Sequence, residues 1–196
     1  MKALPIQKRA LLKREALIDA AIKEFSYTGF EVATAKSIAA QAGVATGTFY
    51  QYFDNKNEIL RVIASQRIDE LQERLNWVAL QEVDELQTIE QVFKQNLEFT
   101  YDFHSSSPEL HQVLEQRRDL DDQLNVIMNK GDAALYERTL QLVKSFNVDS
   151  PKVVAQNLFA MGEGIVHRHV FHETECDTDE VLSIGAQMLA RFFSPS

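Results

Sequence analysis

Glycine and proline are scarce in this chain, and this scarcity limits the folds it can adopt more than any other feature. Only 7 glycines and 4 prolines occur among 196 residues, whereas a sheet protein needs such residues in many hairpin turns. Apolar residues recur instead at spacings of three and four, as at Leu17, Ala21 and Phe25, which is the period of an amphipathic helix. The sequence therefore predicts an all-α protein of about nine helices.

Helix-stop residues divide the N-terminal part into short helices. Gly29 ends a helix that begins near Leu11, and Gly43 ends a shorter one that begins after Thr34, because glycine readily takes the left-handed conformation found after a helix. Two residues then separate Gly43 from a helix that begins at Thr46. Two short helices joined by a tight glycine turn predict a helix-turn-helix unit.

Further N-caps mark where the larger part of the chain begins and continues. Asn55 is an expected cap for a long fourth helix, and Ser150 before Pro151 is an expected cap for a later one, because such side chains accept hydrogen bonds from the first helical amides. We therefore expect a helix-turn-helix domain at residues 1–55 and a larger helical domain at residues 56–196.

The charge of the chain is divided in a similar way. Residues 1–61 hold nine lysines and arginines against six carboxylates, or +3, so residues 62–196 hold eleven against twenty-three, or −12, which gives the total of −9. A locally basic segment attracts a polyanion even on an acidic chain, because charges act within about a Debye length. Chance asymmetry among solvated helix faces explains the division equally well.

Composition and termini favour a cytoplasmic protein without a membrane partner. The single cysteine, Cys176, excludes an intrachain disulfide, which fits a reducing compartment. The N-terminus lacks the apolar core of a signal peptide, and no apolar run approaches the roughly 18 residues of a membrane span.

The helix beginning at Thr46 has two different faces. At 100° per residue, Phe49 and Phe53 fall on one face, which fits a core contact. Thr46 and Tyr50 share another face beside Gly47 and Gln51; small, polar and hydroxyl-bearing side chains of this kind suit a DNA major groove. Tyrosines packed in the core with satisfied hydroxyl groups are the alternative interpretation of the same pattern.

Residues 16–63, "ALIDAAIKEFSYTGFEVATAKSIAAQAGVATGTFYQYFDNKNEILRVI", resemble the DNA-binding domain of the TetR family of bacterial transcriptional regulators. The resemblance includes the helix-ending "GF", the "IAAQAGV" turn, the "GTFYQYF" recognition helix and the "NKNEIL" start of the fourth helix. It implies a double-stranded DNA operator as partner. The expected DNA contacts are Thr34, Lys36, Thr46, Gly47, Thr48, Tyr50, Gln51, Tyr52 and Lys56.

The recognition helix departs from the family pattern at its start. Ala45 stands where relatives often have serine or threonine, and Thr46 stands where a basic residue is common. An N-terminal basic arm is expected to compensate for the missing charge by contacting phosphates or the minor groove. Its residues are Lys2, Lys8, Arg9, Lys13 and Arg14.

The resemblance also implies what the C-terminal helices do. They are expected to bind a small-molecule effector and to form a two-fold homodimer through the last two helices, so that a repressor leaves a pseudopalindromic operator when the effector binds. Ala160, Gly162, Gly164 and Gly185 in those helices permit close approach, although packing within the chain explains them too. No cofactor is expected.

Some apolar and polar side chains of the larger domain could line an effector pocket, and an ordinary core accounts for each of them as well. They are Phe99, Phe103, His104, Met128, Phe159, Met161 and Glu163. No metal site is predicted, because the nearby His167, His169, His172 and Cys176 lack the spacing of a known site.

An enzyme is disfavoured because the chain has no phosphate-binding loop, nucleophile elbow, zinc-protease motif or dinucleotide fingerprint. A helical adaptor that binds only proteins is a third class. It would not need the hydroxyl-bearing face around Tyr50.

Overall fold

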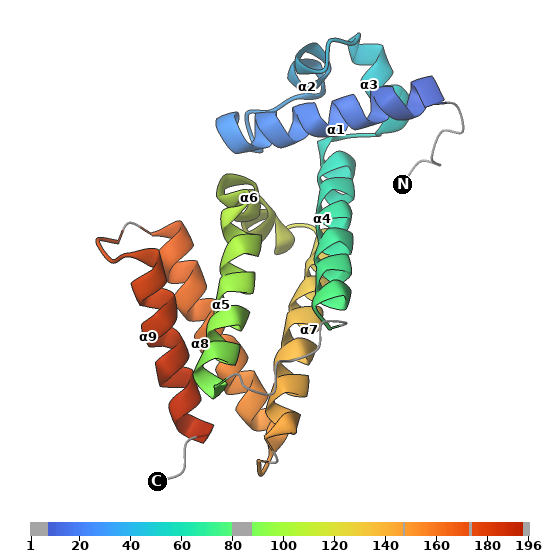
Figure 1. Cartoon of the computed structure of the whole chain (residues 1–196). Helices are drawn as coiled ribbons and strands as arrows, with labels where there is room; N and C mark the ends of the chain where they lie inside the picture. The colour runs from blue at the N-terminus through green and yellow to red at the C-terminus, as the bar shows by residue number, and fades with distance from the viewer. Residues whose placement is uncertain (1–7, 80–87, 147, 173, 194–196) are drawn as a thin grey trace. The chain divides into compact units, whose positions relative to one another are not determined.

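The computed structural model describes residues 8–79, 88–146, 148–172 and 174–193. Over these residues the chain forms nine α-helices, one short 3-10 helix and no strand (Figure 1), which confirms the all-α prediction. The helices are α1 (Lys8–Thr28), α2 (Ala35–Gln41), α3 (Thr46–Tyr52), α4 (Lys56–Ala79), α5 (Ile89–Ser105), α6 (Pro108–Arg118), α7 (Asp122–Ser145), α8 (Pro151–Phe171), α9 (Thr178–Ala190) and η1 (Arg191–Phe193).

The helices pack into two compact units. The first unit contains residues 1–70 and 109–130, and the second contains residues 71–108 and 131–196. Helices α4 and α7 therefore contribute to both units. The two units are defined by which residues pack together and not by what they do. The predicted boundary at residue 55, between the helix-turn-helix domain and the larger domain, therefore stays a prediction.

The core of the first unit is built around three phenylalanines. Phe25, Phe49 and Phe53 are each at most 1% exposed, and each fully buried side chain of this size contributes about 1.5–3 kcal/mol relative to an exposed one. Phe25 comes from α1, Phe49 from α3 and Phe53 from the residue that follows α3. Figure 1 shows α1 beside α2 and α3. The predicted core role of Phe49 and Phe53 is confirmed by their burial.

The helix starts in the first unit follow the predicted caps. The Thr34 hydroxyl oxygen accepts from the amide of Ser37 at 3.0 Å, and the Ser37 hydroxyl oxygen accepts in return from the Thr34 amide, which completes a capping box. The Asn55 side-chain oxygen likewise accepts from the amide of Glu58 at 3.0 Å.

The expected cap at Ser150 is wrong. Ser150 has a positive φ of 54° and makes no side-chain cap hydrogen bond at the start of α8. Its carbonyl oxygen, and not its hydroxyl group, accepts from the amides of Val153 and Val154 at 2.9 and 3.2 Å. Pro151 still begins the helix, since its fixed φ suits the first turn.

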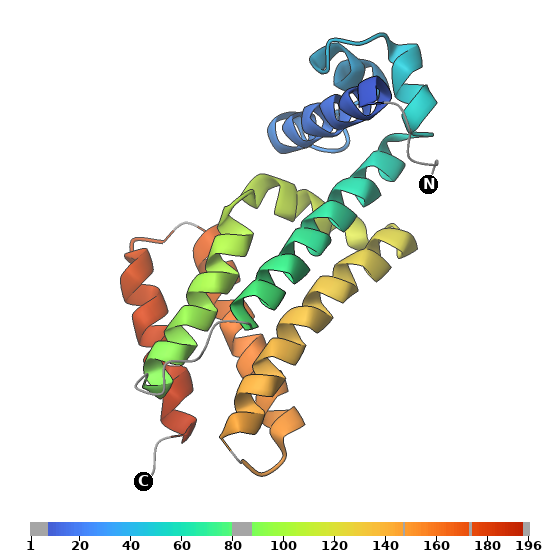
Figure 2. The same cartoon turned by 45° about the vertical axis from the view of Figure 1, so that its right-hand side comes forward.

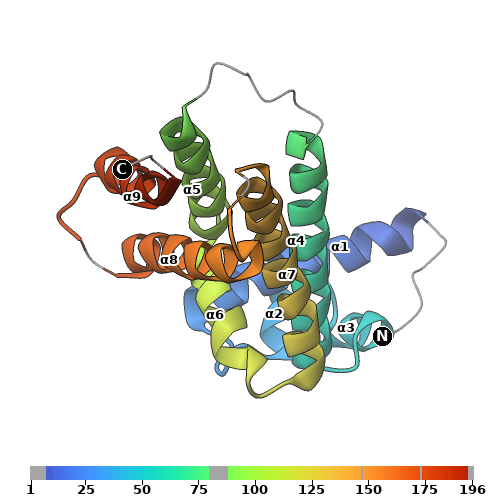
Figure 3. The same ribbon diagram turned by 90° about the horizontal axis from the view of Figure 1, so that it is seen from below.

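In the second unit, α5 packs against α8 and α9, and α8 packs against α9. Figures 2 and 3 show these three helices side by side. A Cβ atom added at Gly185 would lie 3.2 Å from the side chains of Leu97 and Ile165. This glycine therefore allows close packing within the chain, which is the alternative to a role in a dimer interface.

None of the helices in the described part of the chain is long and apolar enough to span a membrane.

Candidate nucleic-acid interface and ligand cavity

A glycine in the left-handed conformation makes the turn between α2 and α3. Gly43 has a φ of +67°, which costs other residues about 1–2 kcal/mol. The amide of Val44 donates to the carbonyl of Ala39 at 2.9 Å and so closes the turn. The α2–α3 unit is thus a compact helix-turn-helix, as predicted.

Helix α3 presents two faces, as its periodicity predicts. The Phe49 and Phe53 rings lie in the core with their centroids 5.7 Å apart. The Tyr50 ring meets the edge of Phe49 at a centroid distance of 5.4 Å, but its side chain is 53% exposed. Thr46, Gly47 and Gln51 are exposed too, so the polar face is open to a partner.

Two of the predicted contacts on α3 are only half exposed. Tyr52 packs against the core of the first unit, and Thr48 is half-buried. The core interpretation thus fits Tyr52 better than Tyr50. On α2, by contrast, Thr34 and Lys36 are exposed at and near the start of the helix, where free amides favour phosphate.

Lys56 has a local structural role that its position in the sequence did not reveal. Its Nζ donates to the carbonyl oxygens of Phe30, Glu31 and Ala33 at 2.7, 3.1 and 3.3 Å. The ammonium group also lies 4.5 Å from the centroid of the Phe30 ring. These contacts tie the start of α4 to the segment between α1 and α2; a phosphate contact by Lys56 stays a prediction.

The basic arm is only partly consistent with the structure. Lys8 and Arg9 are exposed but already lie in α1, although the sequence predicts a helix that begins near Leu11. Including Arg14 in the arm is wrong: it is 8% exposed, with its guanidinium 5.4 Å from the centroid of the Phe53 ring. Lys2 lies outside the described residues.

The second unit contains a cavity of about 40 Å³ between α5, α7, α8 and α9. Its wall is mostly apolar and includes a few polar side chains. The lining residues are Phe93, Asn96, Leu97, Thr100, Leu135, Arg138, Thr139, Leu142, Leu158, Phe159, Gly162, Glu163 and Leu189. The cavity is far smaller than the roughly 300 Å³ of a typical ligand pocket, so in this conformation it has no room for a ligand of ordinary size.

The residues predicted to contact an effector lie in different parts of the structure. Phe159 and Glu163 line the cavity. Met161 is 45% exposed on α8, whereas Met128 lies in the core of the first unit. The remaining three, Phe99, Phe103 and His104, are on α5, where Phe103 and His104 are buried.

Arg138 is the cavity residue that sequence reasoning missed. Its Nε donates to the Asn96 side-chain oxygen at 2.7 Å, and its guanidinium lies 4.8 Å from the centroid of the Phe99 ring. Burial lowers the pKa of Arg138 from its ordinary value. No carboxylate among the described residues forms an ion pair with it. The only hint in the sequence was its place between Leu135 and Leu142 on one face of a helix.

The histidines and the cysteine near the end of α8 do not converge. His169 Nε2 lies 2.9 Å from the Thr178 hydroxyl oxygen, while His172 and Cys176 are exposed. Among the residues whose side chains the structure places, these three form no cluster of metal-ligand atoms.

Comparison with known proteins assigns the N-terminal part to a family. Residues 17–63 match the family model described as bacterial regulatory proteins, tetR family. The fatty acid metabolism regulator protein of Bacillus subtilis (strain 168) is 40% identical over 68 residues, which are 35% of this chain and 34% of that protein. The HTH-type transcriptional regulator HbdR of Aromatoleum sp. (strain CIB) is 38% identical over 61 residues, 31% of this chain and 27% of that protein. The matched stretches thus cover about a third of these relatives or less.

Solved structures extend the likeness to the whole fold. The fatty acid degradation regulator FadR from Bacillus halodurans has a TM-score of 0.69 and 20% identity, and the match covers 97% of both chains. A regulator of the TetR/AcrR family from Thermobifida fusca YX-ER1 has a TM-score of 0.70 and 18% identity over 93% of this chain and 99% of that chain. At such identities the likeness shows the fold alone.

A helix-turn-helix domain followed by a larger set of helices defines the class of helical DNA-binding proteins. Residues 17–63 thus carry the N-terminal domain of the tetR family of bacterial regulatory proteins. The fold of the chain is also that of solved regulators of this kind.

Proposed function

We propose that this protein is a homodimeric transcriptional repressor of the cytoplasm that binds a pseudopalindromic operator and leaves it when a small-molecule effector binds. The observation that carries the proposal is the open polar face of α3: Thr46, Gly47, Tyr50 and Gln51 are exposed while Phe49 fixes the helix from behind. In a two-fold dimer, two such helices would read half-sites about 34–36 Å apart.

The chemistry of this face suits DNA better than a protein partner. Hydroxyl and amide groups donate to phosphates and base edges. Gly47 lets a partner approach the backbone closely, since beyond its chain neighbours and its own helix backbone no atom lies within 4 Å of where its Cβ would be. Lys36 on α2 adds an exposed cation. An adaptor that binds only proteins would gain little from this combination.

The test begins with selection of the fragments that the protein binds from its host genome. Tyr50→Ala should then weaken binding to the selected operator at least ten-fold, because Tyr50 is exposed and its loss removes contacts without disturbing the core. Tyr27→Ala is a matched control: Tyr27 is 87% exposed on α1 of the same unit and should leave affinity unchanged.

Either of two results would contradict the assignment. A folded Tyr50→Ala variant with full operator affinity would remove the tyrosine from the interface. A wild-type protein that selects no sequence above background would favour the adaptor.

The proposed dimer surface is the outer side of α8 and α9. Several apolar side chains there are about half exposed or more, and such a patch marks an interaction surface. They are Met161, Ile184 and Met188, with Phe192 following in η1. Two copies of this pair of helices would form a four-helix interface.

The effector is proposed to be an organic anion with an apolar body. Apolar side chains form most of the cavity wall, and Arg138 supplies a cation that is not paired with a carboxylate among the described residues. The name of the related fatty acid metabolism regulator is compatible with such a ligand. Because the cavity must widen, binding can favour a conformer whose α3 helices no longer match the half-sites.

Decanoate and decanol serve as probes for this class, because they differ only in the headgroup. Arg138→Met should weaken decanoate binding at least ten-fold in isothermal titration and leave decanol binding unchanged, since only the carboxylate uses the guanidinium. Arg168→Met, which removes an exposed arginine of α8, is the control. Equal loss for both probes would mean that Arg138 only maintains the shape of the cavity.

A further inference from the structure

We infer that the second unit contains a binding site for a divalent transition-metal ion, formed by His104 of α5 and by Glu163 and His167 of α8. Sequence analysis placed His104 and Glu163 together only as possible effector contacts and considered His167 with other residues, so it did not join these three. The fold brings their ligand atoms together. The proposal goes beyond regulation of transcription and does not depend on it.

The distances between these ligand atoms suit a small metal ion. One carboxylate oxygen of Glu163, Oε2, lies 3.4 Å from His104 Nε2 and 3.1 Å from His167 Nε2. Zinc binds histidine nitrogens and carboxylate oxygens at about 2.0–2.2 Å, so adjacent ligands of a tetrahedral site are about 3.3–3.6 Å apart. The observed separations are within a few tenths of an ångström of that range.

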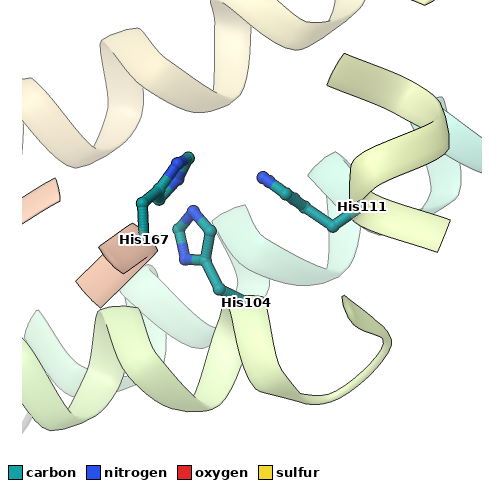
Figure 4. Close-up of side chains that lie close together, drawn as sticks. All are labelled: His104, His111 and His167. Atoms are coloured by element: carbon teal, nitrogen blue, oxygen red, sulfur yellow. The ribbon is translucent and has the colours of Figure 1, made fainter. Parts of the chain in front are cut away.

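The two imidazole rings come from different helices and lie close together. Figure 4 shows His104 and His167 beside each other, and their ring centroids are 4.6 Å apart. Glu163 and His167 are four residues apart on α8, which places them on one face of the helix. The third histidine labelled in the figure, His111, belongs to the first unit and is not one of the proposed ligands.

A second hydrogen bond prepares His104 to act as a ligand. Its Nδ1 lies 2.7 Å from the carbonyl oxygen of Thr100, which can only accept, so Nδ1 carries the proton and donates it. The lone pair of a neutral ring is then on Nε2, the nitrogen that faces Glu163. Metal-binding histidines characteristically donate their other N–H to a backbone carbonyl in this way.

Burial and ligand chemistry define which ions would fit. His104 is 3% exposed, so water competes little for its coordination. Two imidazoles and one carboxylate suit zinc and neighbouring transition metals better than calcium or magnesium, which prefer oxygen ligands alone. Three protein ligands leave one tetrahedral position for water or an anion.

The test is zinc titration of the full, untagged chain after removal of metal with a chelator. The wild type should bind one zinc ion per chain, and Glu163→Gln and His167→Gln should each weaken binding at least ten-fold. His172→Gln is the control, because His172 is exposed at the end of the same helix. The metal-free melting temperature of each variant reports whether it is folded, and both key variants keep the size of the side chain.

The outcomes separate the metal site from a simple ion pair. Loss of binding in Glu163→Gln and His167→Gln, with the control unaffected, supports the site. No zinc binding by the wild type would mean that the histidines only pair with Glu163, and unchanged binding in both variants would place the ligands elsewhere. Either result overturns the proposal.

Discussion

At the residue scale, the most informative side chain is Lys56, whose ammonium group serves the fold directly. It donates to three carbonyl oxygens of the segment between α1 and α2, the nearest at 2.7 Å. Phe30 lies under it and also receives the guanidinium of Arg117 at 4.5 Å from the ring centroid. Arg117 pairs in turn with Glu31 at 2.8 Å. Lys56, which is predicted to contact a DNA phosphate, thus also helps to hold the helix-turn-helix in place.

Lys56→Met should therefore lower the free energy of unfolding by about 1–3 kcal/mol, because hydrogen bonds from a charged donor are lost and the carbonyl groups lose a partner. Urea unfolding followed by circular dichroism measures this change. Lys36→Met is the matched control, since Lys36 is exposed and should change stability by less than about 0.5 kcal/mol. A stable Lys56→Met variant with weakened operator binding would show instead that Lys56 acts chiefly on DNA.

At the scale of elements, an ion pair joins α4 to the start of α7 within the first unit. Arg61 Nη2 lies 2.8 Å from Asp121 Oδ2, and Arg61 Nε donates to both carboxylate oxygens at 3.0 and 2.9 Å. Asp121 also accepts from the amide of Leu124 at 3.1 Å and so caps α7. Burial by itself raises the pKa of Asp121, but the hydrogen bonds from Arg61 and from the Leu124 amide lower it overall.

Because folding lowers the pKa of Asp121, the contribution of its ion pair to stability depends on pH. The pKa of Asp121 is lower in the folded chain than in the unfolded chain, where it is about 3.9, so the stabilisation is present above that pH and is lost as pH falls through the folded pKa. Asp121→Asn should reduce the free energy of unfolding by about 1–3 kcal/mol at pH 7, and the difference from wild type should shrink below about pH 4.

Urea unfolding at a series of pH values measures this difference. Asp122→Asn is the control, because Asp122 is the exposed neighbour at the start of the same helix. A difference between wild type and Asp121→Asn that does not change with pH would show that the charge of Asp121 is unimportant for stability.

The same elements show how far sequence reasoning extends. Thr34, Asn55, Gly29 and Gly43 mark helix ends through their own backbone and side-chain chemistry, and the structure has helix ends at each of them. Ser150, by contrast, stands before α8 in the left-handed conformation and makes no side-chain cap hydrogen bond. Caps and glycine turns can therefore be predicted from the sequence where hydrogen bonds between neighbouring residues decide the backbone conformation.

At the scale of the whole molecule, assembly through α8 and α9 is the property most open to test. Met188 is 56% exposed among other apolar side chains of this pair of helices, and a charge buried there without a partner would oppose association. Met188→Glu should shift the protein from dimer to monomer in sedimentation. It should also weaken operator binding at least ten-fold, because one chain reads only one half-site.

Leu120→Glu provides the control for that experiment. Leu120 is 70% exposed in the first unit, outside α8 and α9, so a charge there should leave both the dimer and the operator affinity intact. A dimeric Met188→Glu protein would place the interface on another surface.

The helical class, the helix-turn-helix and the two faces of α3 could be predicted from the chain, because helical period, capping and glycine turns act over three or four residues. The meeting of distant groups could not: Lys56 reaches three carbonyl oxygens, Arg138 lines the cavity, and His104 lies beside Glu163 and His167. Those contacts depend on how the helices pack against one another, and such contacts between distant residues produce no periodic pattern in the sequence.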